Sequence, residues 1–144
     1  KHLQMRAVMR SIQATNQTQT QGVAINNNTT NGSYNGHSLT GNGSTVSSGA
    51  SGFYNLAFQF AFYPGANNTA NQFGAQIIDI LDYTSTTKNK TIRVFGGHTS
   101  STISSIGLLS NVFINTGAVT SIQFNYSGYQ FAIGSRISLY GVRG

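Results

Sequence analysis

The segment Phe131-Ala-Ile-Gly-Ser-Arg-Ile-Ser-Leu-Tyr-Gly-Val-Arg143 has the near-alternating pattern of a half-buried β-strand. Arg136 and Ser138 share one parity, while Ile137 and Leu139 share the other. A Gly-Ser pair just before Arg136 supplies a turn signal. Pairing within a sheet holds a chain end that would otherwise fray. The segment therefore predicts a closing strand that is built into a sheet.

Two other segments have strong strand patterns. Between His2 and Arg10 the aliphatic residues occupy alternate positions, and this period of two favours a strand although several of the residues are good helix formers. Between Phe53 and Tyr63 one parity carries large apolar side chains, and the other is mostly small or polar. Pro64-Gly65 ends this second strand, because proline and glycine favour turns.

The segment from Phe73 to Tyr83 is ambiguous. Its isoleucine content favours a strand. The spacing of Phe73, Ile77, Ile80 and Leu81 also fits one face of a helix, so both structures stay open.

Shorter elements separate these segments. A long strand or a strand pair is predicted over 103–114, with Gly107 as a candidate β-bulge. The polar segment 13–21 is predicted to be a loop. Further strands are predicted over 23–25, 91–95 and 119–126, and further turns at 85–89, 96–97, 117 and 127–128.

Residues Asn26 to Gly52 consist mainly of Asn, Thr, Ser and Gly, with repeated Asn-Gly and Gly-Asn pairs. Such pairs are turn signals, so we expect a long loop. Long loops inside compact domains often carry function. The alternative is a solvated excursion that Tyr34 and Leu39 hold against the core.

Seven to nine strands and no convincing helix indicate an all-β fold, and we expect a jelly-roll-like antiparallel β-sandwich. A length of 144 residues fits a single domain over 1–144. The chain opens at Lys1 inside a strand pattern, so we expect the C-terminal part of a longer polypeptide or a processed product.

The surface must be built mainly from uncharged polar residues. Charged residues make up 7% of the chain, against about 25% in typical domains. Such surfaces suit exposed β proteins, sugar-contacting proteins and subunits that pack against copies of themselves. The net charge of +6 comes from scattered residues, whereas nucleic-acid binding needs a denser basic stripe. We therefore expect no nucleic-acid partner, and the lack of a long apolar run predicts no membrane insertion.

The residue types argue against catalysis. The only carboxylates are Asp79 and Asp82, which would point to opposite faces of a strand, so each is expected to pair with a basic residue or to cap a turn. The three histidines lack metal-binding spacing, although a trimer axis could gather copies of His37 or His98 around an ion. No cysteine and no Gly-x-Ser-x-Gly elbow occur. We expect a non-enzymatic protein without a cofactor.

Aromatic and amide residues near turns are the candidate binding residues. Exposed tyrosine can stack on a sugar ring while amides bond its hydroxyls, and this composition suits recognition surfaces. The alternative for the tyrosines is packing at the rim of the core. The candidates, which lie in or near the predicted loops 26–52 and 96–101 and the turn at 127–128, are Tyr34, His37, Asn42, His98 and Tyr129.

Four segments resemble modules of bacteriophage fibres and virion surfaces. They are the opening strand His2 to Ser11, the run Gly36-His-Ser-Leu-Thr-Gly-Asn-Gly43, the stretch Ala70 to Tyr83 with Lys88-Asn-Lys-Thr91, and the segment from Ala118 through Gly134-Ser-Arg-Ile-Ser-Leu-Tyr-Gly141. The resemblance implies a jelly-roll-like fold and assembly into larger virion structures as homotrimers.

The sequence and the resemblance together predict a phage structural protein located on the virion. The preferred role is a fibre or tail module that contacts a host-surface receptor or glycan. The alternative is a capsid decoration or head-fibre protein that stabilises the virion, with its partners among the other virion proteins. In that alternative, the aliphatic face of His2 to Arg10 would be buried against another virion chain.

Overall fold

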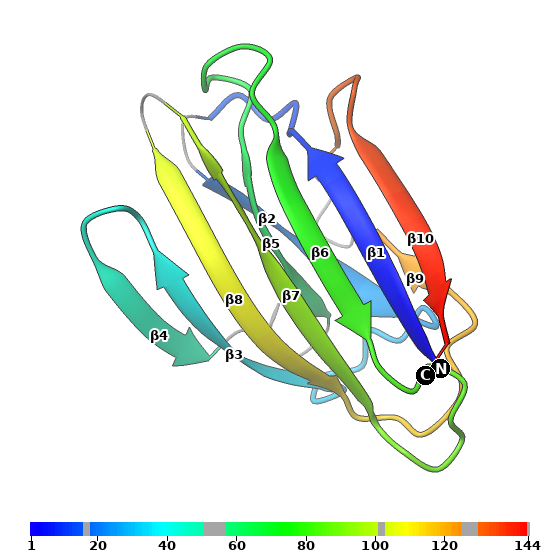
Figure 1. Cartoon of the computed structure of the whole chain (residues 1–144). Coiled ribbons are helices and arrows are strands. Elements are labelled where there is room, and N and C mark those ends of the chain that lie inside the picture. Colours follow the sequence, from blue (N-terminus) through cyan, green and yellow to red (C-terminus); the bar gives the residue numbers. More distant parts are fainter. Residues whose placement is uncertain (16–17, 51–56, 101–102, 125–129, 144) are drawn as a thin grey trace.

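The computed structural model describes residues 1–15, 18–50, 57–100, 103–124 and 130–143, which form two antiparallel β-sheets packed as a sandwich (Figure 1). No α-helix occurs within these ranges. The expectation of an all-β, antiparallel β-sandwich is therefore confirmed.

Seven strands form the larger sheet and three form the smaller one. The larger sheet has the order β10 (Arg136–Val142), β1 (His2–Met9), β6 (Gly74–Ile80), β7 (Lys90–Thr99), β8 (Ser104–Phe113), β3 (Tyr34–Gly41), β4 (Val46–Ala50). The smaller sheet has the order β5 (Phe58–Pro64), β2 (Thr18–Ile25), β9 (Ile122–Gln123).

The core lies between the two sheets, because every second residue of the central strands points inward. In β6 and β7 the burial alternates strictly along the strand. The larger sheet contributes Met5, Met9, Ile78, Ile80, Ile92, Val94, Leu109 and Phe113, and the smaller sheet contributes Val23, Ile25, Phe58 and Tyr63. This core confirms the aliphatic inward face expected for the first strand.

Most of the ambiguous segment from Phe73 to Tyr83 is a strand, β6 (Gly74–Ile80), and Leu81 to Tyr83 lie in the turn that follows it. Strand β6 pairs with β1 on one side and β7 on the other. This position buries Ile78 and Ile80 on one face and leaves Ile77 on the opposite face. Pairing with a strand on each side favours the strand over the helix, because both neighbours supply hydrogen-bond partners for the backbone of β6.

The predicted loop over 26–52 is wrong from Tyr34 onward, whereas 26–33 lie outside any strand and 51–52 lie outside the described residues. The segment contains β3 and β4, which form a hairpin, and β3 also pairs with β8. Backbone hydrogen bonds hold these strands, and they do not require apolar side chains. The many small polar residues fit because the hairpin reaches the exposed edge of the sheet (Figure 1).

Three other predictions, of a loop, a turn and a β-bulge, differ from the structure. The loop predicted over 13–21 is wrong in its second half, since β2 begins at Thr18. Gly96 and Gly97 lie inside β7 instead of forming a turn, because the register with β6 and β8 runs unbroken through them. Gly107 lies in one long strand without a register shift, so it is not a bulge.

Two further strands are only partly described. Within the described residues, the strand predicted from Phe53 begins at Phe58, and 53–56 lie outside those residues. The strand predicted over 119–126 is limited to Ile122–Gln123, and 125–126 also lie outside them.

Arg10 is buried, although its parity predicted an exposed side chain. The reason is that β1 ends at Met9, so the alternation stops there. Only 8% of the Arg10 surface is exposed. Its guanidinium donates four hydrogen bonds of 2.7–2.9 Å to backbone carbonyls of the β5–β6 connection, which belong to Ala66, Asn68, Thr69 and Gln72. One side chain thus fixes the whole connection.

Lys90 is a second buried cation held in the same way. Its Nζ donates to the carbonyl oxygens of Lys88, Thr116 and Asn115 at 2.6, 3.0 and 3.4 Å. Burial lowers the pKa of Lys90, because the charged form loses contact with water. Lys90 joins the β6–β7 turn to the segment that follows β8.

We expect Arg10→Ala to lower the free energy of unfolding by about 2–4 kcal/mol, because it leaves several buried carbonyls without a donor. Urea unfolding of the purified chain measures the change. The matched control is Arg136→Ala at an exposed position, which we expect to change stability by less than about 0.5 kcal/mol. Equal effects of the two variants would contradict the role assigned to Arg10.

Candidate functional site: the outer face of the seven-stranded sheet

The outer face of the larger sheet turns away from the smaller sheet, and its residues form rows across the strands. The registers define a first row of Ser138, Arg6, Ile77, Phe95, Leu108, Leu39 and Ser48. A second row contains Arg136, Val8, Ala75, Gly97, Ile106, Gly41 and Val46. A third, polar row contains Tyr140, Gln4, Asp79, Arg93, Ser110, His37 and Ala50.

The first two rows form an exposed apolar patch. We call it the outer patch, and it consists of Val8, Leu39, Val46, Ile77, Phe95, Ile106 and Leu108. Each of these side chains is between 41% and 76% exposed. Soluble monomers seldom expose contiguous apolar surface on this scale, and such patches mark sites of interaction. The outer patch is therefore the candidate functional site.

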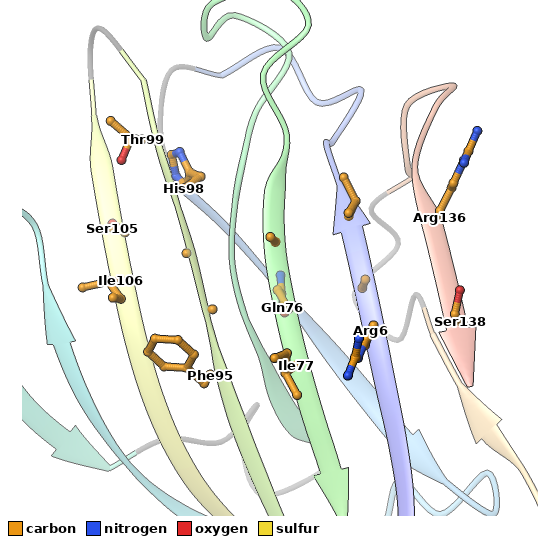
Figure 2. Close-up of a pocket in the computed structure, with 15 residues that line it drawn as sticks. Arg6, Gln76, Ile77, Phe95, His98, Thr99, Ser105, Ile106, Arg136 and Ser138 are labelled. Atoms are coloured by element: carbon orange, nitrogen blue, oxygen red, sulfur yellow. The ribbon is translucent and has the colours of Figure 1, made fainter. Parts of the chain in front are cut away.

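The outer patch is hollowed over β6 and β7. A groove of about 740 Å³ runs across β1, β6, β7 and β8, and Figure 2 shows Ile77, Phe95 and Ile106 along it. Its floor contains Ala75 and Gly97, which neighbour each other across the strands. A Cβ at Gly97 would collide with the carbonyl oxygen of Ser105, so glycine keeps this floor open. A smaller hollow of about 310 Å³ adjoins it over β8 and β3.

Charge is kept to the border of the outer patch. Arg6 is turned towards the polar row, since its Nε donates to Gln4 Oε1 at 3.1 Å and its guanidinium lies 5.7 Å from the centre of the Tyr140 ring. In the polar row, Arg93 and Asp79 form an ion pair at 3.4 Å. Arg136, on the edge strand β10, lines the groove at its border (Figure 2). The centre of the patch carries no charge.

This chemistry favours a protein partner over a sugar at the outer patch. A glycan needs side-chain donors and acceptors for its hydroxyls. The seven side chains of the patch are hydrocarbon, and the polar residues that line the groove, among them Arg6, Thr99 and Ser138, lie around them. The described residues contain no group of three or more His, Cys, Asp or Glu that could hold a metal ion. They also contain no helix long and apolar enough to cross a membrane.

Tyr34, a predicted binding residue, lies in the core with 1% of its surface exposed. Its ring stacks on Phe113 with 4.9 Å between centroids. Its hydroxyl accepts a hydrogen bond from Ile25 N at 2.7 Å and donates to Asn28 O at 3.1 Å. The side chain offers no surface to a ligand, so the binding role expected for Tyr34 does not fit the structure. The alternative, packing against the core, does.

Asn42 organises the turn between β3 and β4. Its Oδ1 accepts hydrogen bonds from both the backbone N and the hydroxyl of Ser44, at 3.1 Å each, and of Thr45, at 2.8 and 3.0 Å. Gly43 in the same turn has a φ of 94°, which suits glycine. The side-chain oxygen of Asn42 thus accepts hydrogen bonds within the turn.

The two candidate histidines lie in different environments. His37 is exposed on β3 in the polar row. His98 is 7% exposed near the end of β7, and burial lowers its pKa. Tyr129 lies outside the described residues. The four described candidates are therefore not brought together into one site, and the loop expected over 96–101 is occupied up to Thr99 by β7.

Both aspartates have the structural roles expected of them. Asp79 pairs with Arg93 and also accepts a hydrogen bond from Gln4 Nε2 at 3.1 Å. Asp82 lies in the turn after β6 and pairs with Lys88 at 3.1 Å, which lowers the pKa of its carboxyl.

A sequence signal for the outer patch exists in the pairs Ile77-Ile78, Val94-Phe95 and Leu108-Leu109. Two adjacent apolar residues place one on each face of a strand, because side chains alternate. Central strands that are apolar on both parities are typical of sheets that are covered on both faces. This pattern occurs in β6, β7 and β8. The sequence alone does not show that these strands are neighbours, because that depends on the strand order in the sheet.

Comparison with protein-family models, with curated proteins and with solved structures found no match to this chain.

We expect the stability of the chain to fall as the pH rises through the alkaline range because of Tyr34. Burial raises its pKa from 10.0 to about 12, so the folded state favours the neutral phenol. Its contribution is fully present below the unfolded pKa of 10.0 and is lost between there and about 12, by at most about 3 kcal/mol.

Urea unfolding at several alkaline pH values checks this expectation. Tyr34→Phe should flatten the dependence on pH, whereas Tyr140→Phe at an exposed position should keep it. Lys90 is present in both variants, so its own titration cancels in the comparison. The same slope in Tyr34→Phe and the unaltered chain would contradict the assignment.

Proposed function

We propose that this chain is a non-enzymatic structural protein of a bacteriophage virion, held in the particle through the outer patch. The observation that carries the proposal is the uncharged apolar surface on the face of the larger sheet. A neighbouring protein chain that covers it removes hydrocarbon from water, at about 25 cal/mol for each Å². An enzyme would need a cluster of polar groups at its site instead.

Two further observations support the virion context. Four segments spread over the chain resemble phage fibre and virion-surface modules. The almost uncharged surface also suits a subunit that packs closely with neighbours, because few charges must be desolvated in an interface. The homotrimer implied by the resemblance remains a prediction that a mass measurement tests.

The aliphatic face of β1 is not the surface that a neighbouring virion chain would cover. Met5, Ala7 and Met9 are buried inside the chain itself, against its own core. The outer patch replaces this face as the docking surface in either role, whether the protein stabilises a capsid or stands in a fibre.

The β3–β4 hairpin supports the role of a fibre or tail module that contacts the host. Figure 1 shows this hairpin projecting at one edge of the larger sheet. Every residue of β4 is exposed, and β4 pairs only with β3 among the described strands. Leu39 and Val46 of the hairpin belong to the outer patch, whereas the turn around Asn42 and the remaining polar residues lie outside it. That polar part can meet a receptor or glycan while the outer patch is covered. Affinity would come from several copies acting together.

The outer patch is tested by Leu108→Lys, which places a charge at its centre. We expect association with the neighbouring virion chain to weaken by roughly tenfold or more, because the lysine must be desolvated in the contact. Ser110→Lys is the matched control, since it lies on the same exposed parity of β8 but in the polar row. Incorporation into particles and the sedimentation of the purified chain measure the effect.

Equal incorporation of Leu108→Lys and the unaltered chain would contradict docking through the outer patch. Cryo-electron microscopy of the particle gives an independent answer. An outer patch that faces solvent in every copy would contradict the proposal as well.

The host contact is tested separately by His37→Ala. His37 is exposed on β3, so we expect the thermal unfolding midpoint to stay within about 2 °C. Adsorption of particles to the host cell should weaken if the hairpin meets the receptor. Asn35→Ala is the control, since Asn35 is also exposed on β3 but lies two residues nearer the start of the strand. Unchanged adsorption of His37→Ala would contradict contact through this part of the hairpin.

A further inference from the structure

Strand β10 is an open edge of the larger sheet. It pairs with β1 on one side, and no other strand of the described residues pairs with its second side. All seven residues from Arg136 to Val142 are exposed. Along an open edge, every second residue directs its backbone N–H and C=O away from the sheet, ready to pair with another strand.

This edge lacks the features that usually prevent strands from pairing. Proline, lysine, a bulge or short length normally protects an edge. The register of β10 with β1 runs without a shift from Arg136 to Val142, and the only charge in the strand is at its first residue. The opposite edge, β4, is shorter and consists largely of serine and glycine. The two edges therefore differ in their capacity to pair.

The sequence of β10 is complementary to itself when it is reversed. An antiparallel pair of two β10 strands centred on Leu139 places Leu139 opposite its own copy. Ile137 then lies opposite Gly141, and Ser138 lies opposite Tyr140, so Ile137 and Tyr140 each meet a small residue. Arg136 lies opposite Val142, so like charges are not opposed.

The backbone of β10 is also compatible with this pairing. In this register, the residue at position i pairs with the residue at position 278 − i of the second copy. The two positions are both even or both odd. Backbone N–H and C=O groups that point away from β1 therefore meet groups that also point away from β1 in the other copy. The inner-face side chains of β10 are themselves uncovered, since Leu139 is 56% exposed and Ile137 is 37% exposed. Self-pairing would bring these side chains together across the axis.

We propose that β10 pairs antiparallel with β10 of a second copy of this chain, around a two-fold axis at Leu139. The larger sheets of the two copies then form one continuous sheet. Hydrogen bonds between the backbones supply the affinity, and the alternation of large and small side chains fixes the register. Such a contact is isologous, because each copy contributes the same surface.

This contact is independent of the virion function proposed above. The outer patch lies on the face of the sheet, whereas β10 pairs along its edge, so both surfaces can be occupied at once. A two-fold contact gives even numbers of copies. If the predicted homotrimer also forms, β10 would join two trimers into a hexamer.

The test is a disulfide across the proposed axis, made with Leu139→Cys. The chain has no cysteine of its own, so the new thiol can react only with its copy. Directly opposite residues of antiparallel strands have Cα atoms about 4.5–5.5 Å apart, which suits a disulfide. Oxidised glutathione converts two thiols into one disulfide while it is itself reduced. We expect most of the chain to become a covalent dimer on a non-reducing gel.

Two control variants make the result specific. Val46→Cys places a thiol at a more exposed position on the other edge strand, β4 (76% against 56% for Leu139), and Leu108→Cys places one at a similarly exposed position in the outer patch (53%). We expect both to form covalent dimers at least about tenfold more slowly than Leu139→Cys, since neither lies at the proposed axis. Equal or slower cross-linking of Leu139→Cys would overturn the proposal.

Hydrogen exchange on the unaltered chain is a second measurement that needs no substitution. In a monomer, the outward amides of β10 exchange with water, whereas in the paired form they are protected. We expect protection at every second residue of β10 to rise with protein concentration. Protection should not rise in Leu139→Lys, in which two charges would face each other at the axis. Outward amides that remain unprotected in an associated chain would overturn the proposal.

The two proposals fail separately. Loss of particle incorporation in Leu108→Lys tests the outer patch and leaves β10 unchanged. Loss of cross-linking or protection at Leu139 tests β10 in the purified chain and requires no virion.

Discussion

In the described part of the chain, a sheet of seven strands is covered on one side by a sheet of three, and the exposed surfaces follow from this mismatch. The smaller sheet packs against the middle of the larger one, where the inward residues are buried. It does not reach the edges, so β4 and β10 are exposed on both faces. The other face of the larger sheet carries the uncovered outer patch.

The scarcity of carboxylates determines how charge is handled. Asp79 and Asp82 are both used in ion pairs at the surface, so the buried cations have no acid to pair with. Arg10 and Lys90 are surrounded by backbone carbonyls instead. Backbone carbonyl oxygens in the connections between strands thereby gain hydrogen-bond donors. These bonds fix the β5–β6 connection and join the β6–β7 turn to the segment after β8. Burying each cation therefore helps to define the ends of the sandwich.

The outer patch and the β10 edge suit different kinds of contact. The outer patch offers apolar side chains, whose interactions have no preferred direction, so it favours close packing against a protein surface. The edge offers backbone hydrogen bonds, which are directional and set a register. A subunit that carries both can pair with a copy along its edge while another chain covers its face. Such an arrangement suits a repeated structural assembly.

The sequence by itself determined the all-β class and the buried face of β1, because local alternation records which side of a strand is buried. It also located the closing strand, but the half-burial predicted for that strand is wrong. All residues of β10 are exposed, because the smaller sheet does not cover this edge. The sequence did not reveal β3 and β4, since backbone pairing with β8 holds them and their side chains carry little pattern. It placed Tyr34 among binding residues, whereas contact with Phe113 and Ile25 makes it part of the core. The outer patch was also beyond reach. Its members come from six strands, and only the tertiary strand order sets them side by side on one face.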